Sequence, residues 1–437
     1  MHGVSTGLLA TGNAVMKMRL TASAQRHSSI HFSLKNCTFA PLKKHNQLFV
    51  EMRLIVLLSR FPYPLEKGDK LRAYHQLRQL SAEHEVYLVA LSEYAVPDAD
   101  LQQLTPYCKE IYPIKINAAR RFFNLGRAFF CGLPIQCGYF YNKHIQKQIN
   151  QIIQKVQPDW LYCQLFRMAE YVKDKPIKKV LDYQDVFSKG MWRRYERAPW
   201  YLKPFFKMEA RRVARHEVDI FDQFDAKTII TEIDRDLMPH ERRQEIVVVP
   251  NGVDFDSFSF PPQEKKYDLI FSGNMNYGPN VDAAEYLCHD IFPHLHVEFP
   301  ELRIVLCGAN PSARVKALEN EHIKVTGWVD SMAEWYAQSR IFIAPMRMGT
   351  GLQNKLLEAM AMQIPCVTSM LAGKPLVDAD KYKAVVMATT TADYVEAVRR
   401  LLTDNAYYQN LAMRGNQYVH QYYDWATATK PLMELFV

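Results

Sequence analysis

The residues with the clearest chemical potential lie between positions 344 and 361, in the segment Ala-Pro-Met-Arg-Met-Gly-Thr-Gly-Leu-Gln-Asn-Lys-Leu-Leu-Glu-Ala-Met-Ala. A predicted strand ends at Pro345, and a glycine-containing loop leads into an amphipathic helix. Arg347 and Lys355 are cations that could neutralise a diphosphate. Glu358 follows about one turn inside the helix, where a carboxylate can accept two hydrogen bonds from a vicinal diol such as a ribose. The alternative is a surface Glu358 that pairs with Lys355 three positions earlier.

Glycines follow two other predicted strands. Gly68 opens a predicted helix after the first strand, and Gly273, with Asn274 beside it, follows the first strand of the second half. A phosphate between such loops would lie near two helix N-termini. Neither loop is a GxGxxG fingerprint or a Walker loop, which disfavours a nicotinamide enzyme. For Gly68 an ordinary turn before a helix is an equally good interpretation.

Asp185 follows a predicted strand that ends near Leu181. A carboxylate there could orient a substrate hydroxyl. Asp182 or Asp185 could equally be the N-cap of the next helix. The eight cysteines form no CxxC pair, so a zinc site is not expected, and a reducing, cytoplasmic setting fits best.

These side chains depend on an alternating pattern of strands and helices that begins at Met52. Short β-branched runs at 53–58, 86–91, 160–163, 179–181, 228–231 and 246–249 form a first set of predicted strands. A second set lies at 268–271, 302–307, 322–325, 341–344, 365–368 and 384–386. Alternation of this kind predicts two Rossmann-like parallel-sheet domains of the α/β class, 52–255 and 256–415, with a hinge at the Pro-Asn-Gly near 250. Ligands of such sheets bind beyond the carboxyl ends of the strands.

The composition limits the function classes. The chain has 437 residues, enough for two domains, and residues 1–51 carry six basic residues and one acid. The other 386 residues carry 48 bases and 45 acids, so no strongly basic nucleic-acid-binding domain is expected. Residues 1–51 have no sustained period, and we expect them to be a poorly ordered leader. Residues 120–130 alternate arginine and aromatic residues, which suits either a peripheral membrane contact or a helix packed on the core.

Taken together, these segments resemble the family-4 retaining glycosyltransferases of the GT-B fold, over nearly all of 52–437. The segments Leu-Leu-Glu-Ala-Met-Ala at 356–361 and Ile-Pro-Cys-Val-Thr-Ser at 364–369 are similar to the donor-binding signature of that family. Segments 60–70, 249–254 and 273–280 are similar to a bacterial branch associated with exopolysaccharide synthesis.

The resemblance implies a fold and a set of roles. The domain 52–255 would bind the acceptor, the domain 256–415 would bind a nucleotide-sugar donor across a central cleft, and a last helix, 416–437, would pack back on the first domain. The donor-binding residues would be Gly68, Gly273, Asn274, Thr350, Gly351 and Glu358, with Glu358 on the ribose. Thr350 stands where the family has a glutamate that contacts the donor sugar. The catalytic residues would be Asp185, Arg347 and Lys355, the two cations replacing family cations near the first strand of the second domain.

The implied reaction is a front-face displacement with retention, using a UDP- or GDP-type donor and no metal or other cofactor. The acceptor would be a glycan or a polyprenyl-linked sugar, at the inner face of the cytoplasmic membrane, and no nucleic acid would be bound. Two alternatives stay open at this point. One is a GT-B nucleotide-sugar epimerase, and the other is a non-catalytic nucleotide-sugar-binding or scaffold subunit.

Overall fold

The computed structural model of the protein describes residues 8–11, 14–17, 51–349 and 351–436. It has two units, residues 1–50 and 51–437. In the first unit, β1 (Leu8–Thr11) pairs antiparallel with β2 (Ala14–Lys17). The remaining residues of the predicted leader, 1–7, 12–13 and 18–50, lie outside the described residues.

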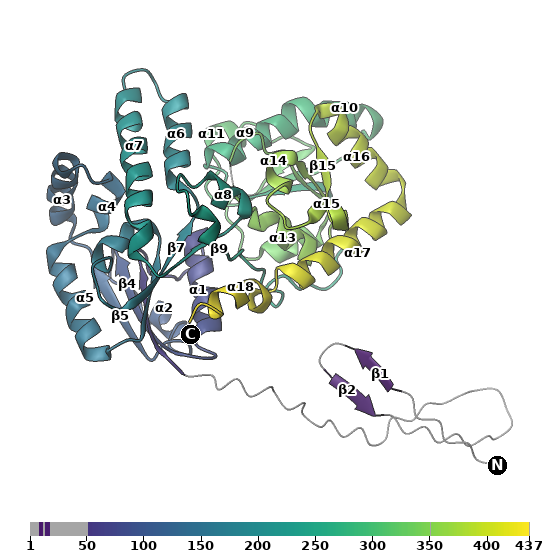
Figure 1. The fold of residues 1–437 in the computed structure, drawn as a ribbon. Coiled ribbons are helices and arrows are strands. Elements are labelled where there is room, and N and C mark those ends of the chain that lie inside the picture. The colour runs from purple at the N-terminus through teal and green to yellow at the C-terminus, as the bar shows by residue number, and fades with distance from the viewer. Residues whose placement is uncertain (1–7, 12–13, 18–50, 350, 437) are drawn as a thin grey trace, which may run out of the picture. The chain divides into compact units, whose positions relative to one another are not determined.

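The second unit contains two parallel sheets with helices on their faces (Figure 1). The seven-stranded sheet has the order β5-β4-β3-β6-β7-β8-β9. Its strands are β3 (Arg53–Leu58), β4 (Glu85–Ser92), β5 (Glu110–Lys115), β6 (Trp160–Gln164), β7 (Lys178–Gln184), β8 (Ala226–Ile229) and β9 (Val247–Val248). The six-stranded sheet has the order β12-β11-β10-β13-β14-β15. Its strands are β10 (Tyr267–Ser272), β11 (Ile304–Cys307), β12 (Ile323–Val325), β13 (Ser339–Ala344), β14 (Cys366–Ser369) and β15 (Val386–Ala388). The predicted fold class, two Rossmann-like parallel-sheet halves, is confirmed.

Strand β5 was not predicted from the sequence. It contains Pro113, which lacks an N–H for the sheet ladder, and most of its side chains are only partly buried. Because β5 pairs with β4 alone, it is an edge strand, where proline is tolerated. The weak apolar pattern of an edge strand explains why this segment carried no strand prediction.

The helices of the first half connect its strands. They are α1 (Gly68–Leu80), α2 (Asp98–Gln102), α3 (Ala118–Cys131), α4 (Ile135–Phe140), α5 (Lys143–Val156), η1 (Phe166–Tyr171), α6 (Phe187–Arg197), α7 (Lys203–Asp219), η2 (Phe221–Gln223), α8 (Glu232–Leu237) and η3 (Arg243–Glu245). The helices α6 and α7 pack against each other as a hairpin (Figure 1). The amphipathic helix α5 shows the local cause well, because Asn142 caps its N-terminus and Ile145, Ile149 and Ile153 bury one face.

The helices of the second half follow the same plan. They are α9 (Gly278–Tyr286), η4 (Leu287–Ile291), α10 (Phe292–Glu298), α11 (Ala313–Lys316), α12 (Met332–Ala337), α13 (Asn354–Ala361), α14 (Met370–Gly373), α15 (Ala379–Tyr382), α16 (Thr391–Thr403), α17 (Asn405–Tyr422) and α18 (Trp425–Met433). Helix α17 packs on α13, whereas α18 packs on α1 of the first half. The chain therefore crosses back at Tyr423–Asp424, so the predicted closing helix 416–437 is two helices with a break between them.

The chain passes between the halves near Val253 and again near Tyr423, and these two segments contact each other. The Val253 N–H donates to the Tyr423 carbonyl at 2.7 Å, and the Trp425 ring stacks on His75 of α1 with centroids 4.6 Å apart. A Cβ on Gly252 would lie 2.7 Å from the Trp425 ring, so this position accommodates only a glycine. Packing of Trp425 thus fixes the hinge that the Pro-Asn-Gly turn predicted.

The helices of the described residues have one further property in common. None of them is both long enough and apolar enough to span a bilayer.

Candidate functional site

Lys355, the second residue of α13, lies beside the loop that follows β10. Its Nζ donates to Asn280 Oδ1 at 2.7 Å and lies 4.6 Å from the centre of the Phe271 ring. Burial lowers the pKa of Lys355 to about 7, although the nearby Glu358 carboxylate acts in the opposite direction. The Asn280 amide in turn donates to the Asn274 carbonyl at 3.0 Å. The lysine is therefore held at a helix N-terminus, where an anion is favoured.

Glu358 lies one turn further along α13 and accepts a hydrogen bond from the Tyr336 hydroxyl at 3.1 Å. Burial raises the pKa of Glu358 to about 6, and the Tyr336 hydroxyl and Lys355 partly offset this rise. Because only Oε2 takes the tyrosine bond, Oε1 is the oxygen left for a substrate hydroxyl. The structure thus brings Lys355 and Glu358 together, and Glu358 is not the exposed surface residue of the alternative interpretation.

Two glycines let the loops approach each other at this point. Gly273 has φ +147°, and a Cβ there would lie 2.6 Å from Asn280 Nδ2 and 3.2 Å from Lys355 Nζ. Gly308 has φ +143°, and its Cβ would lie only 2.0 Å from the Gly273 carbonyl oxygen. Side chains at either position would displace the neighbouring backbone or the lysine. Asn274 itself is exposed, and its side chain accepts from the Asn276 N–H at 3.0 Å.

The first half contains a cavity of about 760 Å³, and loops of the second half complete its lining. Five arginines line it together with two carboxylates. The arginines are Arg60, Arg167, Arg193, Arg194 and Arg197, and the carboxylates are Asp69 and Asp185. Tyr277, Pro279 and Gly349 of the second half complete the lining. Arg60 was not predicted as a site residue, because only the tertiary structure brings the loop after β3 and η1 together.

Asp185 lines this cavity. Burial raises the pKa of Asp185, and Arg193 partly offsets the rise. The carboxylate of Asp234 lies near enough to Asp185 to feel its charge. Burial and this charge together raise the pKa of Asp234 to about 6. A Cβ on Gly351 would lie 3.7 Å from Asp234 Oδ2, so Asp234 approaches the loop that precedes α13.

Two other predicted site residues, Arg347 and Gly68, stand apart from this arrangement. Arg347 is exposed and bonded through two guanidinium nitrogens to Asp282 of α9, at 2.8 and 3.1 Å, rather than beside Lys355. Gly68 is exposed, and nothing lies within 4 Å of a Cβ placed on it, so no close approach requires a glycine there. Thr350 lies outside the described residues.

A buried polar network connects the two walls. Arg72 of α1 forms a two-point ion pair with Asp182 of β7, at 2.8 and 3.0 Å, and both side chains are fully buried. Arg72 also donates to Asn251 Oδ1 at 3.0 Å, and the Asn251 amide donates to Asn354 Oδ1 at 3.1 Å. Asn354 is the first residue of α13. The network therefore links β7 to the helix that carries Lys355 and Glu358.

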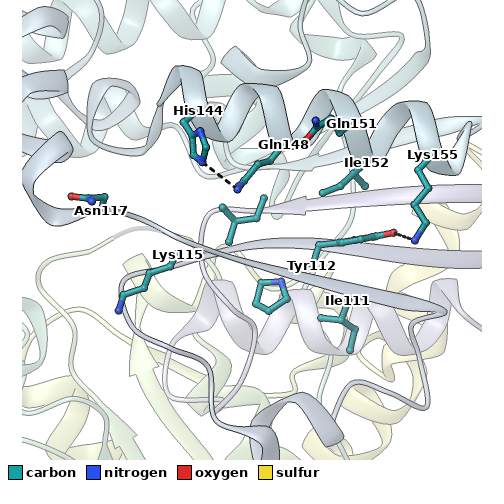
Figure 2. Close-up of a pocket in the computed structure, with 11 residues that line it drawn as sticks. Ile111, Tyr112, Lys115, Asn117, His144, Gln148, Gln151, Ile152 and Lys155 are labelled. Carbon is teal, nitrogen blue, oxygen red and sulfur yellow. Dashed lines mark hydrogen bonds between the residues drawn. The ribbon is translucent and has the colours of Figure 1, made fainter.

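A second cavity, of about 750 Å³, lies between the edge strand β5 and α5 (Figure 2). Figure 2 shows His144 and Gln148 directed toward each other along α5, and Tyr112 of β5 bonded to Lys155. None of its lining residues comes from the second half. Because the described residues of the second half do not reach this edge, the site between the halves is the better candidate.

Part of the second half matches a known protein family. Residues 266–404 match the family model described as glycosyl transferases group 1, so a group 1 glycosyltransferase domain contains the β10 loop, Lys355 and Glu358. The chain is also similar to the phosphatidyl-myo-inositol mannosyltransferase of Mycobacterium leprae (strain TN), with 25% identity over 201 residues. That match covers 44% of this chain and 53% of the relative, so it spans about half the length of the curated relative.

Solved structures share the fold across most of the chain. Sucrose-phosphate synthase from Thermosynechococcus elongatus is 13% identical, with a TM-score of 0.61, and the match covers 88% of this chain and 98% of that one. The UDP complex of HepE from Anabaena is 13% identical, with a TM-score of 0.62, covering 88% and 99%. At these identities the likeness establishes the fold, which is the predicted GT-B fold.

Proposed function

We propose that the protein is a retaining glycosyltransferase that moves a sugar from a nucleoside-diphosphate donor to a glycan or lipid-linked acceptor. The observation that carries this proposal is the placement of Lys355 and Glu358 at the start of α13, beside Gly273, inside the group 1 domain. Lys355 would neutralise the leaving diphosphate, and Glu358 would accept hydrogen bonds from the ribose diol. Stabilisation of the leaving-group charge is the main electrostatic demand of such a transfer.

The donor in this proposal is of the UDP or GDP type. The Anabaena neighbour was solved with UDP, which supports a nucleoside diphosphate in a fold of this kind. No metal or other cofactor takes part in the proposed reaction, because Lys355 and the N-terminus of α13 supply positive charge at the diphosphate. Gly351 and Asn274 belong to the loops that would surround the donor.

The acceptor side of the proposal rests on Asp185, which would orient the attacking hydroxyl. The proposed role is the synthesis of exopolysaccharide or another cell-surface polysaccharide, at the cytoplasmic face of the membrane. Helix α3 supports a peripheral contact through 120–130, because Phe130 is 87% exposed and Phe129 is 43% exposed. Such aromatic residues favour the membrane interface.

A thermal-shift screen with UDP, GDP, ADP and their sugar conjugates tests the donor site directly. Binding to the native state raises the melting temperature, so one nucleotide should stabilise the wild type and lose most of this effect in Glu358→Ala. Glu301→Ala, which removes an exposed carboxylate of the same half, is the matched control and should keep the shift. A wild type that no nucleotide stabilises at millimolar concentration would contradict the proposal.

The same preparation distinguishes a transferase from a non-catalytic subunit. Transferases hydrolyse their donor slowly without acceptor, so released nucleoside diphosphate should accumulate with the wild type and not with Lys355→Met. The anomeric configuration of the released sugar, followed by NMR at early times, tests retention. Nucleotide binding without any donor cleavage would favour the scaffold alternative.

A further inference from the structure

The cavity of the first half carries more positive charge than its carboxylates can balance. Arg60 is paired with Asp69 at 2.5 Å, and Asp185 lies beside Arg193. The other three arginines have no ion pair among the described residues. These are Arg167, Arg194 and Arg197. Three uncompensated guanidinium groups in one cavity favour an anionic ligand.

Arg167 is the strongest indication, because it is 93% buried and still lacks a partner. Its exposed fraction is 7%, and no hydrogen-bond acceptor in the described part of the chain contacts its Nε. The guanidinium lies over the rings of Phe140 and Phe187, at 4.9 and 5.8 Å from their centres, which holds its orientation. Burial and, to a smaller extent, the nearby charge of Arg60 lower the pKa of Arg167 to about 10. A buried cation with an open donor beside another cation is unfavourable unless an anion joins them.

We infer that this arginine cavity binds a phosphate or pyrophosphate group of the acceptor substrate. The assignment of the ligand to the acceptor rests on the proposed function. The assignment of a phosphate group rests on the arginine side chains themselves. Guanidinium groups bind phosphate oxygens in a two-point geometry, and Arg194 and Arg197, about one turn apart on α6, are two exposed guanidinium groups in the lining.

The position of the cavity assigns the phosphate to the acceptor rather than to the donor. Neither Lys355 nor Glu358 is among its lining residues. Asp185, the proposed contact of the acceptor hydroxyl, lines it, and the described residues of the second half contribute Tyr277, Pro279 and Gly349. A phosphate held by Arg167 would therefore place the rest of the acceptor between Asp185 and the donor loops.

Inorganic pyrophosphate is the probe for this inference. It is titrated into the full chain carrying Lys355→Met, and binding is measured by calorimetry. That background removes the donor-side cation, so the binding that remains belongs to the arginine cavity. Adding Arg194→Gln and Arg197→Gln should weaken this binding by about tenfold or more, because charge-assisted hydrogen bonds are lost. These two side chains are exposed, so their loss should leave folding intact.

The matched control removes two exposed arginines, Arg211→Gln and Arg215→Gln, from the neighbouring helix α7, outside the cavity. Equal weakening by both double variants would mean that pyrophosphate follows net charge alone and would overturn the inference. Arg167→Met serves as a third variant, with its melting temperature measured first, and should also weaken binding. Undiminished pyrophosphate affinity in all variants would likewise overturn the inference.

The nucleotide experiment separates this inference from the proposed function. The nucleoside diphosphate that stabilises the wild type should bind Arg194→Gln/Arg197→Gln with unchanged affinity. If the double variant loses nucleotide affinity to the same extent as pyrophosphate affinity, the cavity holds the donor and the inference is wrong. If no nucleotide binds, the proposed function fails, and the pyrophosphate titration still decides the cavity.

Two sources could supply such a phosphate, a lipid headgroup or a soluble sugar phosphate. Phosphatidylcholine vesicles with and without a polyprenyl pyrophosphate, compared with a soluble sugar 1-phosphate, separate them. Selective binding to the pyrophosphate vesicles supports a lipid-linked acceptor, and equal binding of the soluble sugar phosphate supports a free one. Arg194→Gln/Arg197→Gln should reduce whichever binding is seen, and binding of neither probe would contradict the inference.

Discussion

The two walls of the site carry their positive charge in different ways. On the second half, Lys355 is the cation beside the β10 loop, and its pKa lies near 7 because of burial. On the first half, five arginines line one cavity, and even the buried Arg167 keeps a pKa near 10. A lysine of this kind gains or loses its proton in the physiological range, whereas the arginines stay charged.

The walls also differ in what holds their side chains. The wall formed by the second half, which is the donor side of the proposed function, depends on the close backbone approach at Gly273 and Gly308. It also depends on the Asn280 amide, which orients Lys355. The acceptor-side wall is supported by a buried ion pair, Arg72–Asp182. We therefore expect the stability of the second half to be most sensitive to backbone strain. The stability of the first half should be most sensitive to the loss of a buried charge partner. The following predictions test this contrast, from the largest expected effect to the smallest.

Arg72→Met should produce the largest loss of stability. It leaves Asp182 charged and unpaired in the core, and breaking a buried pair by removing one partner costs about 3–5 kcal/mol. Urea unfolding followed by circular dichroism measures this. Arg78→Met, an exposed position on the same helix, is the control and should change the free energy of unfolding little. A loss below about 1 kcal/mol for Arg72→Met, as for an exposed pair, would contradict the assignment of this pair as the main support of its wall.

Gly308→Ala should weaken the donor-side wall through the backbone. Its φ of +143° and the 2.0 Å approach of a Cβ to the Gly273 oxygen predict a loss of about 1–3 kcal/mol or more. Nucleotide affinity should fall as well, because Gly273 and Lys355 must shift. Gly278→Ala is the matched control, since nothing lies within 4 Å of its Cβ and its φ is ordinary. Equal stability of the two alanine variants would show that the close approach is not required.

The affinity for the nucleoside diphosphate should depend on pH through Lys355. The anion favours protonated lysine, so affinity should fall as pH rises above about 7, by up to about tenfold per pH unit. Binding above that pH should also take up a proton, which calorimetry in buffers of different ionisation enthalpy detects. Lys355→Met should bind weakly and show a flat profile in this range. An unchanged slope in Lys355→Met would assign the titration to another group.

Below about pH 6, a second titration should appear on the same wall. Burial raises the pKa of Glu358 to about 6, so this carboxylate becomes protonated as pH falls through that value and loses its acceptor strength toward a diol. Nucleotide affinity should therefore decline on the acid side, and Glu358→Gln should remove the decline. Pyrophosphate binding in the arginine cavity should not respond to Glu358→Gln.

Arg347→Ala should have the smallest effect. Because Arg347 is half exposed and paired with Asp282, its removal should cost less than about 1 kcal/mol of stability. Nucleotide affinity should fall far less than in Lys355→Met. A loss as large as that of Lys355→Met would show that Arg347 leaves Asp282 to bind the diphosphate, as the sequence analysis proposed.

Much of the fold was predictable, because parallel strands buried on both faces give unbroken apolar runs. The twelve predicted strands are all present, with ends displaced by a few residues, as at β8 and β15. The edge strand β5 escaped prediction because half-exposed strands with proline lack that pattern. The proximity of Lys355 and Glu358 was predictable because they lie three positions apart on one helix.

The sequence by itself determined the order of the elements and the donor-side helix, since both follow from local periodicity and short spacing. Only the tertiary structure decided which cations share a site. It placed Arg347 against Asp282, and it gathered Arg60, Arg167 and Arg194 from three separate segments. The physical reason is that charges along a chain carry no record of their distant neighbours, whereas folding sets the distances and burial that fix each group's partner and pKa.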